Sequence, residues 1–256
     1  MNRLILTLLF TCIPLIAKAA EPIADYSASY SVQYNSLTVG ELNQTLTTLE
    51  NGDRLLRSET RPRGLVSLFR SDNVEEQSRW RDYQGTIQPL EYRYERTGRR
   101  PKFLHMLFDW QEYQLDMDDK KHPWSLTLKP GTLDRLIYQL AVMRDLSNGE
   151  QELQYHIADG GKLKHHEILI LETETVSTSL GTIEAVKLVR DRDDDSDRQT
   201  ILWCAPSLGY LTVKLQHIEK DGATFTASLR ELTGRDTSVF TPEQRPVNNP
   251  GFRTTP

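Results

Sequence analysis

The stretch Tyr26–Tyr34, YSASYSVQY, decides the fold class. Its even-numbered positions hold Tyr, Ala, Tyr, Val and Tyr, whereas its odd-numbered positions hold Ser, Ser, Ser and Gln. Successive side chains of a β-strand point to opposite faces of the sheet, so strict alternation is typical of a strand with one buried face and one wet face. This stretch therefore predicts a half-buried strand at the start of the folded domain.

The same alternation recurs along most of the chain, and turn sequences such as Asn51-Gly52-Asp53 and Asp221-Gly222 separate the runs. From Ile201 to Ala205 it predicts that Ile201, Trp203 and Ala205 face inward. The other alternating runs are Leu90–Glu95, Tyr113–Met117, Trp124–Leu128, Leu211–Leu215 and Phe225–Leu229.

Three segments are apolar on both faces: Lys102–Trp110, Glu167–Leu171 and Ala185–Val189. Strands of this kind are expected to be covered on both sides. We therefore predict an all-β fold, built as a strongly curled antiparallel sheet or an open β-barrel.

One segment has helical rather than strand periodicity. From Leu133 to Leu146, apolar residues recur three and four positions apart. Thr132 is placed to cap the helix and Asp134 lies in its first turn, which is a favourable place for an acidic side chain. We predict one amphipathic helix that packs against the sheet.

Residues 1–19 have the features of a cleaved secretory signal peptide. A basic start is followed by the apolar run Leu4–Ile16 and by Ala17-Lys18-Ala19, a small-x-small cleavage pattern. The apolar run is shorter than the ~20 residues that span a bilayer. We therefore expect a periplasmic protein without a transmembrane span, with a single mainly-β domain over residues 20–232 and a flexible tail over residues 233–256.

Charge and cysteine content limit the possible partners and cross-links. The full chain carries a formal net charge of −5, which makes nucleic acid a poor candidate partner. Cleavage would remove Cys12 and leave Cys204 as the one cysteine, so no intramolecular disulfide is expected. We interpret Cys204 as a small buried apolar residue, not as a nucleophile.

Basic residues gather between Asn51 and Lys102. Their densest part is a candidate surface for an anionic group or a partner protein, although basic residues on solvated strand faces and loops would give the same pattern. The candidate residues are Arg93, Arg96, Arg99, Arg100 and Lys102.

The run Asp191–Asp197 is the most acidic part of the chain. The spacing of Asp191, Asp193 and Asp195 matches the start of a calcium-binding loop, but Ser196 and Leu202 stand where that loop needs glycine and glutamate. A hairpin loop is the preferred interpretation, and loose divalent-cation binding stays open. His165 and His166 are adjacent and would point to opposite faces of a strand, so we predict no metal site and no cofactor.

Six aromatic residues are candidates for lining an apolar ligand site inside the curled sheet, where they would also serve as core. They are Tyr30, Tyr92, Tyr94, Trp110, Trp124 and Trp203, and Tyr34 shares the predicted inward face of the first strand. Large aromatic side chains stabilise a core by burial, and barrel interiors lined by them also accept acyl chains.

The order of several short motifs resembles the exported bacterial proteins of the domain-of-unknown-function family DUF3108. After the tyrosine-rich first strand come Val39-Gly40-Glu41, Gly85-x-x-x-Pro89-x-x-Tyr92, Phe108-Asp109-Trp110, Gly131-x-x-Asp134, Asp159-Gly160-x-Lys162, Leu180-Gly181-Thr182, Val189-Arg190, Trp203 and Leu208-Gly209-Tyr210-Leu211. The resemblance implies an all-β periplasmic domain and brings no catalytic residues. A further analogy, to the half-open barrels of periplasmic lipoprotein carriers, rests on the predicted shape.

Three functions are compatible with these features. The first is a binding or accessory protein of the cell envelope that holds a lipid or a lipidated partner in its apolar interior. The second is a structural or adaptor protein that binds another envelope protein. The third is a glycan- or lipid-directed hydrolase, although the sequence contains no Gly-x-Ser-x-Gly motif and no catalytic residue is assigned.

Overall fold

The computed structural model describes residues 22–64, 72–119, 123–159, 161–190 and 198–242. The predicted signal peptide and the acidic run at residues 191–197 lie outside these ranges. The described residues form one 15-stranded sheet with the strand order β8-β7-β6-β5-β4-β3-β2-β1-β15-β14-β13-β12-β11-β10-β9. The predicted all-β class with one helix is confirmed.

The sheet consists of two runs of consecutive antiparallel strands that join where β1 pairs with β15. β9 and β10 are parallel. The first run contains β1 (Tyr26–Tyr34), β2 (Leu37–Thr48), β3 (Arg54–Pro62), β4 (Val74–Tyr83), β5 (Thr86–Arg96), β6 (Lys102–Asp109), β7 (Gln114–Asp118) and β8 (Trp124–Thr127). The second contains β10 (Leu153–Asp159), β11 (Lys162–Thr178), β12 (Gly181–Arg190), β13 (Gln199–Ala205), β14 (Leu211–Ile218) and β15 (Thr224–Thr233), and the short β9 (Leu133–Asp134) precedes it.

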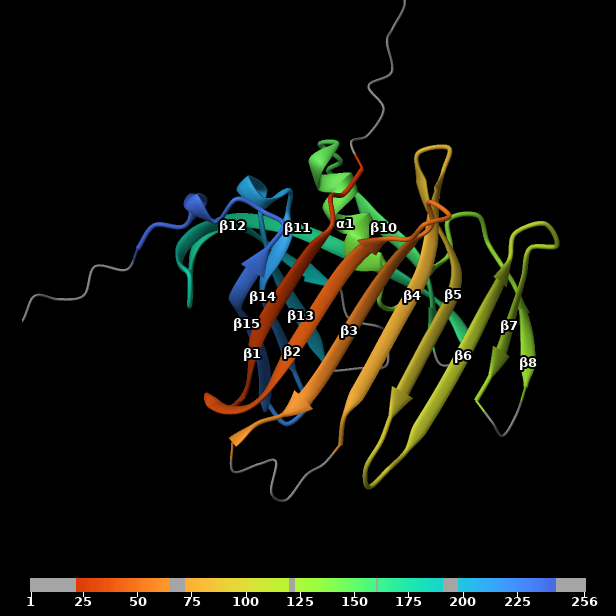
Figure 1. Cartoon of the computed structure of the whole chain (residues 1–256), viewed down its shortest axis with the longest axis horizontal. Coiled ribbons are helices and arrows are strands. Elements are labelled where there is room, and N and C mark those ends of the chain that lie inside the picture. Colours follow the sequence, from red (N-terminus) through yellow and green to blue (C-terminus); the bar gives the residue numbers. More distant parts are fainter. Residues whose placement is uncertain (1–21, 65–71, 120–122, 160, 191–197, 243–256) are drawn as a thin grey trace, which may run out of the picture.

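The sheet is strongly curled. In Figure 1, β1 to β6 cross the front of the molecule, while β10, β11 and the helix α1 (Tyr138–Ser147) lie behind them. The two ends of the sheet approach each other at Trp124 of β8 and Gly161, which precedes β11. A Cβ atom on Gly161 would lie 2.4 Å from Cζ2 of Trp124, so this glycine leaves the space that the indole ring fills.

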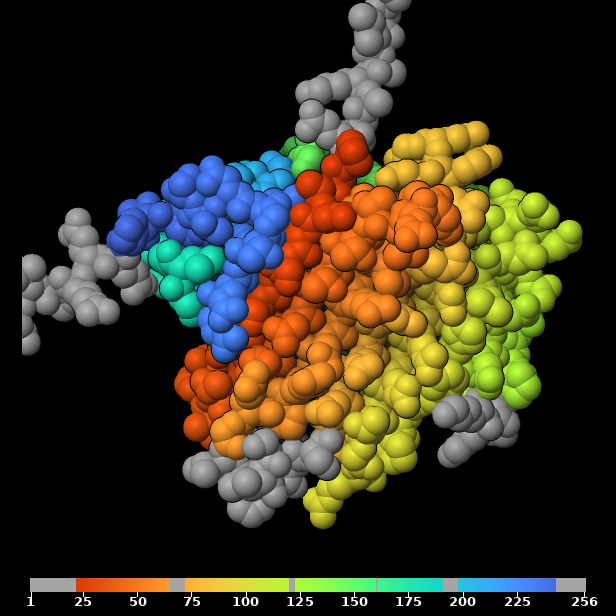
Figure 2. Space-filling view, viewed as in Figure 1, coloured from red at the N-terminus to blue at the C-terminus, as the bar shows by residue number. Residues whose placement is uncertain are grey.

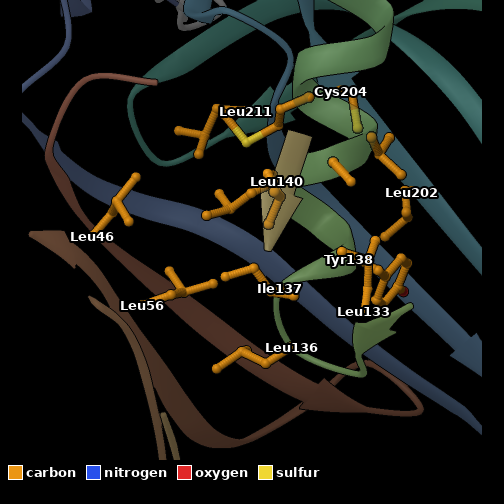
Figure 3. Packing of buried hydrophobic residues seen from close by; sticks show 14 of the residues in the cluster. Leu46, Leu56, Leu133, Leu136, Ile137, Tyr138, Leu140, Leu202, Cys204 and Leu211 are labelled. Carbon is orange, nitrogen blue, oxygen red and sulfur yellow. The ribbon is translucent and has the colours of Figure 1, made fainter. Parts of the chain in front are cut away.

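The helix fills one end of the curl. Seven of its ten residues are buried, so it packs on nearly all sides instead of along a single stripe. Figure 3 shows Ile137 and Leu140 facing Leu46 and Leu56 of the sheet. Cys204 is buried beside them, as predicted.

The helix begins at Tyr138, five residues after the predicted start, and Thr132 does not cap it. The Oδ1 atom of Asp134 accepts hydrogen bonds from the backbone N–H groups of Leu136 and Ile137, at 2.9 and 2.8 Å. These bonds stabilise a turn in place of a first helical turn, and Leu133 and Asp134 pair with β10 as a strand. The apolar spacing continues through this turn, which is why the periodicity alone placed the helix too early.

Two predictions about covered faces are wrong. Leu107, Leu169 and Leu171 are 47%, 46% and 41% exposed, so the segments Lys102–Trp110 and Glu167–Leu171 are not covered on both sides. The neighbours of Trp203 on β13, Leu202 and Cys204, point toward the helix (Figure 3), which places Trp203 on the outer face. Trp203 is nevertheless buried there, because Lys187 and Lys214 lie over its ring. A single leucine on a wet surface is common, and it does not require a second layer.

The chain stays packed on the sheet beyond the boundary predicted at residue 232. β15 continues to Thr233, the side chain of Phe240 is buried, and Thr241 forms a bridge to Thr182. The expected flexible tail therefore begins with ordered residues. Phe240 is an isolated apolar residue without a periodic neighbour, so the alternation gave no sign of it. Residues 243–256 lie outside the described ranges.

Candidate functional site

The inner face of the sheet becomes progressively exposed toward one end. Along β15, the exposed fraction rises from 0% at Leu229 to 7% at Ala227 and 39% at Phe225. Along β1 it rises from 4% at Tyr30 to 38% at Tyr34. This end, which lies at the bottom of Figure 1 and away from α1, is called the open end below.

Three large apolar side chains lie next to one another at the open end. Tyr34 pairs with Leu37 across the β1–β2 hairpin and with Phe225 across the β1–β15 seam, so all three share the inner face. The rings of Tyr34 and Phe225 are 4.9 Å apart, and Leu37 is 64% exposed. We call Tyr34, Leu37 and Phe225 the rim patch.

The hairpin turn fixes the rim patch in place. Asn35 and Ser36 both have positive φ values, 45° and 72°, which is the backbone of the tight turn that matches the twist of paired strands. The backbone N–H of Asn35 donates to the carbonyl of Thr224 at 2.9 Å, and the side chain of Asn35 accepts from the N–H of Thr224 at 2.8 Å. The rim patch is therefore held on a rigid turn.

The same row of the inner wall continues into polar and basic residues. Phe225 pairs with His217, His217 with Thr200, and Thr200 with Arg190. Thr200 Oγ1 and His217 Nδ1 lie 3.0 Å apart, within hydrogen-bond distance. Burial lowers the pKa of His217, Glu219 opposes this effect, and Arg190 and Arg198 lower the pKa further.

Two ion pairs also lie inside the curl of the sheet. Arg135 donates to both carboxylate oxygens of Glu76, at 3.0 and 2.8 Å, and the hydroxyl of Tyr92 donates to Glu76 at 2.7 Å. The guanidinium carbon of Arg135 lies 4.5 Å from the ring centre of Tyr94. A bidentate pair stacked on an aromatic ring holds Arg135 in one orientation.

The second pair joins Lys164 to Asp159 at 2.8 Å. Burial acts to raise the pKa of Asp159, but Lys164, Arg135 and Lys102 hold it below its ordinary value. The nitrogen of Lys102 also lies 5.8 Å from the ring centre of Tyr94. We call Glu76, Lys102, Arg135, Asp159 and Lys164 the charged cluster; it contains three cations and two carboxylates.

The predicted aromatic residues do not gather in one pocket. Tyr92 and Tyr94 lie beside the charged cluster, and Tyr30 lies deeper, where its hydroxyl donates to the carbonyl of Thr212 at 2.9 Å. Trp124 faces Gly161 at the edge of the sheet. The other two are remote from the open end. Trp110 Nε1 donates to the carbonyl of Pro89 at 2.6 Å, and Trp203 Nε1 donates to Glu174 at 2.8 Å on the outer face.

The predicted basic residues divide between three places. Lys102 belongs to the charged cluster, whereas Arg93 is exposed on the outer face and lies 3.3 Å from Glu95. Arg96, Arg99 and Arg100 lie at the tip of the β5–β6 hairpin. Several members of the rim patch and the charged cluster were not among the predicted site residues, because only the pairing of distant strands brings them together. They are Leu37, Phe225, Glu76, Arg135, Asp159 and Lys164.

The outer face of β2 to β5 contains a separate polar hollow of about 470 Å³. Figure 2 shows this face of the molecule. The side chains around the hollow alternate in charge and include Arg57, Glu59, Glu75, Gln77, Arg93 and Glu95.

One carboxyl group has a strongly raised pKa, but it is not accessible. Burial raises the pKa of Asp134 to about 6, against hydrogen bonds from Ser78, Ile137 and Leu136 that lower it. Its exposed fraction is 0%, and Ser78 Oγ donates to its Oδ2 atom at 2.6 Å. A raised pKa often marks a catalytic carboxyl group. Here the carboxyl group stabilises the turn that precedes α1, and no substrate can reach it.

Asp109 also has a structural role. Its Oδ1 atom accepts from the N–H groups of Gln111 and Glu112, at 2.9 and 3.0 Å, which fixes the turn after β6.

His165 and His166 point to opposite faces of β11, one exposed and one buried, as predicted. Among the described residues, no three His, Cys, Asp or Glu side chains converge in a way that could hold a metal ion. Within the same ranges, α1 is too short to cross a membrane, and no other helix reaches the length and apolar character that a span needs.

Comparison with known proteins gives a family and a fold. A family model described as "Protein of unknown function (DUF3108)" matches residues 29–230. A β-barrel-like protein of the family DUF1849 from Brucella abortus superposes with a TM-score of 0.54 at 10% identity, covering 84% of this chain and 99% of that one. That likeness is to the fold alone.

A proposed lipoprotein from Parabacteroides distasonis gives a TM-score of 0.35 at 11% identity, covering 82% and 95% of the two chains, and this similarity is too low to carry an argument. No curated protein matches the sequence.

Proposed function

The chain belongs to the DUF3108 family of proteins of unknown function, and from the geometry of this member we propose that it is a binding protein of the bacterial cell envelope. Its ligand is the apolar part of a lipid or of a lipidated partner, held at the open end. The envelope location is supported by the signal-peptide features of residues 1–19.

The observation that carries the proposal is the rim patch. Three adjacent large apolar side chains on the inner face of a folded domain are 38%, 64% and 39% exposed, at Tyr34, Leu37 and Phe225. Adjacent exposed apolar side chains on a folded domain often belong to a surface that a ligand or a partner covers. Completing the burial of such side chains would contribute about 1 kcal/mol or more for each.

The charged cluster suits the polar end of the same ligand. It lies on the inner face of the sheet, as the rim patch does, and has more cations than carboxylates. Arg135 is oriented by Glu76 and Tyr94, while Lys102 has no ion pair with a described residue. An amphipathic molecule with an anionic headgroup would therefore contact apolar and cationic side chains on the same inner face.

Binding of a dansyl-labelled fatty acid to the mature protein tests this function. The variant Leu37→Ser/Phe225→Ser should weaken binding by about 30-fold, because roughly 2 kcal/mol of apolar contact is lost. The matched control is Leu107→Ser/Leu169→Ser, which removes leucines of 47% and 46% exposure from the outer face. Equal affinities of the two variants, or no binding by the wild type, would exclude the open end as the ligand site.

A further inference from the structure

The tip of the β5–β6 hairpin presents two arginine side chains on a fixed backbone. Asp72 Oδ1 accepts a hydrogen bond from the backbone N–H of Arg99 at 2.8 Å, and Arg96 Nε donates to the carbonyl of Arg100 at 2.7 Å. Arg99 and Arg100 are both exposed, and neither guanidinium forms an ion pair with a described residue. The backbone is held in place, while the two charges remain available to a partner.

This tip and the rim patch lie at the same end of the molecule. The β1–β2 hairpin, which carries Tyr34 and Leu37, and the β5–β6 hairpin both end at the bottom of Figure 1. Two acidic side chains of neighbouring hairpins are paired with basic residues within the protein. Glu219 pairs with Arg198 at 2.7 Å, and Asp159 pairs with Lys164 at 2.8 Å.

A pocket of about 710 Å³ lies beside the tip. Its lining includes Arg96, Lys102 and the ring of Phe103, together with Glu95 and Asp119. A phosphate group could approach Arg96 and Lys102 here while the rest of the tip lies against the surface that carries it.

We propose that the open end docks on an anionic phospholipid surface, with Arg99 and Arg100 at the phosphate groups and the rim patch in the interfacial layer. Basic side chains gain about 1 kcal/mol each near an anionic leaflet, and aromatic and aliphatic side chains add the burial of apolar area. This inference rests on the proposed function and deepens it. The surface that the protein touches is also the source or the destination of the lipid that it holds.

Flotation of the mature protein with lipid vesicles tests the docking. The wild type should float with vesicles of phosphatidylcholine that contain phosphatidylglycerol, and much less with phosphatidylcholine alone. Added salt should weaken the association, because it screens exposed charges.

The informative variant is Arg99→Gln/Arg100→Gln, and Arg57→Gln/Arg81→Gln on exposed outer positions is the control with the same change in charge. The tip variant should bind anionic vesicles about 30-fold more weakly, at about 1 kcal/mol for each arginine, whereas the control should bind like the wild type. Equal loss in both variants, or equal flotation of the wild type with both kinds of vesicle, would overturn the docking proposal.

Dansyl fatty acid binding separates this proposal from the proposed function. The tip variant should retain that binding, since Arg99 and Arg100 lie outside the rim patch and the charged cluster. If the wild type binds the probe but does not float, the lipid site stands and the docking surface is excluded. If it floats but binds no probe, the docking surface stands and the lipid site is excluded.

Discussion

Replacing Asp134 with asparagine should remove the contribution of this carboxyl group to the pH dependence of the free energy of unfolding. The carboxyl group has an ordinary pKa of 3.8 in the unfolded chain, and burial raises it to about 6 in the folded protein. Between these two values the folded state binds more protons than the unfolded state. The free energy of unfolding of the wild type therefore falls as the pH rises through this window, and it stays at the lower value above it.

The size of the effect follows from the difference between the two pKa values. One pKa unit corresponds to about 1.4 kcal/mol, so the contribution that is present below about pH 4 and lost above about pH 6 is roughly 3 kcal/mol. An asparagine side chain at this position does not titrate, and its amide oxygen can still accept from the backbone N–H groups of Leu136 and Ile137. Its amide group can also donate to Ser78, which in the wild type donates to the carboxylate.

The assay is urea-induced unfolding followed by tryptophan fluorescence at about pH 4 and at about pH 7. The free energy of unfolding of Asp134→Asn, relative to the wild type, should increase by about 2.5 kcal/mol between the two conditions, which is most of the full effect. Asp159→Asn serves as a contrast, because the pKa of Asp159 is lowered and its removal should cost more stability at the higher pH. If the difference between Asp134→Asn and the wild type is the same at both pH values, the argument from burial is refuted.

Two further substitutions test the packing of the sheet. Gly161→Ala should lower the free energy of unfolding by about 2 kcal/mol or more, because the added Cβ atom would lie 2.4 Å from the ring of Trp124. The control is Gly52→Ala, which has a similar φ value but no atom within 4 Å of the added Cβ, and it should cost only about 1 kcal/mol. Urea titration of both variants checks this, and equal losses would mean that the ring of Trp124 moves away freely. Phe240→Ala should lower the free energy of unfolding by about 2–3 kcal/mol in the same titration, because its side chain is buried against the sheet. A decrease below about 0.5 kcal/mol would mean that residues 233–242 do not stabilise the folded domain.

The strands were predictable because the alternation of apolar and polar residues that marks each strand lies within the strand itself. The alternation at Tyr26–Tyr34 directly reflects the two faces of β1, and the turn at Asp221-Gly222 separates β14 from β15. A curled sheet also followed, although partly from an argument about doubly covered strands that is wrong for Leu107 and Leu169. The helix was found from its spacing, but not its start, because a side-chain interaction of Asp134 decides where it begins.

The candidate site was much less predictable, because it is defined by pairing over long distances in the sequence. Tyr34 and Phe225 become neighbours only through the β1–β15 seam, and Arg135 meets Glu76 only because the segment before α1 crosses the interior. Nothing within ten residues of Phe225 distinguishes it from a core residue. Trp203 shows the same limit: Leu202, Trp203 and Cys204 are all apolar and buried, so local alternation could not distinguish the two faces of β13 and chose the wrong one.

The position of the β1–β15 seam has a consequence for the order in which the molecule can be assembled. Strands near the beginning and the end of the chain meet in the middle of the sheet, with seven strands on one side of the pair and six on the other. Each side can form from contacts between consecutive strands, which are quick to find, but the joining step must close a loop of nearly the whole chain. A polypeptide that is still emerging from a ribosome cannot join its two halves until its last strand is free.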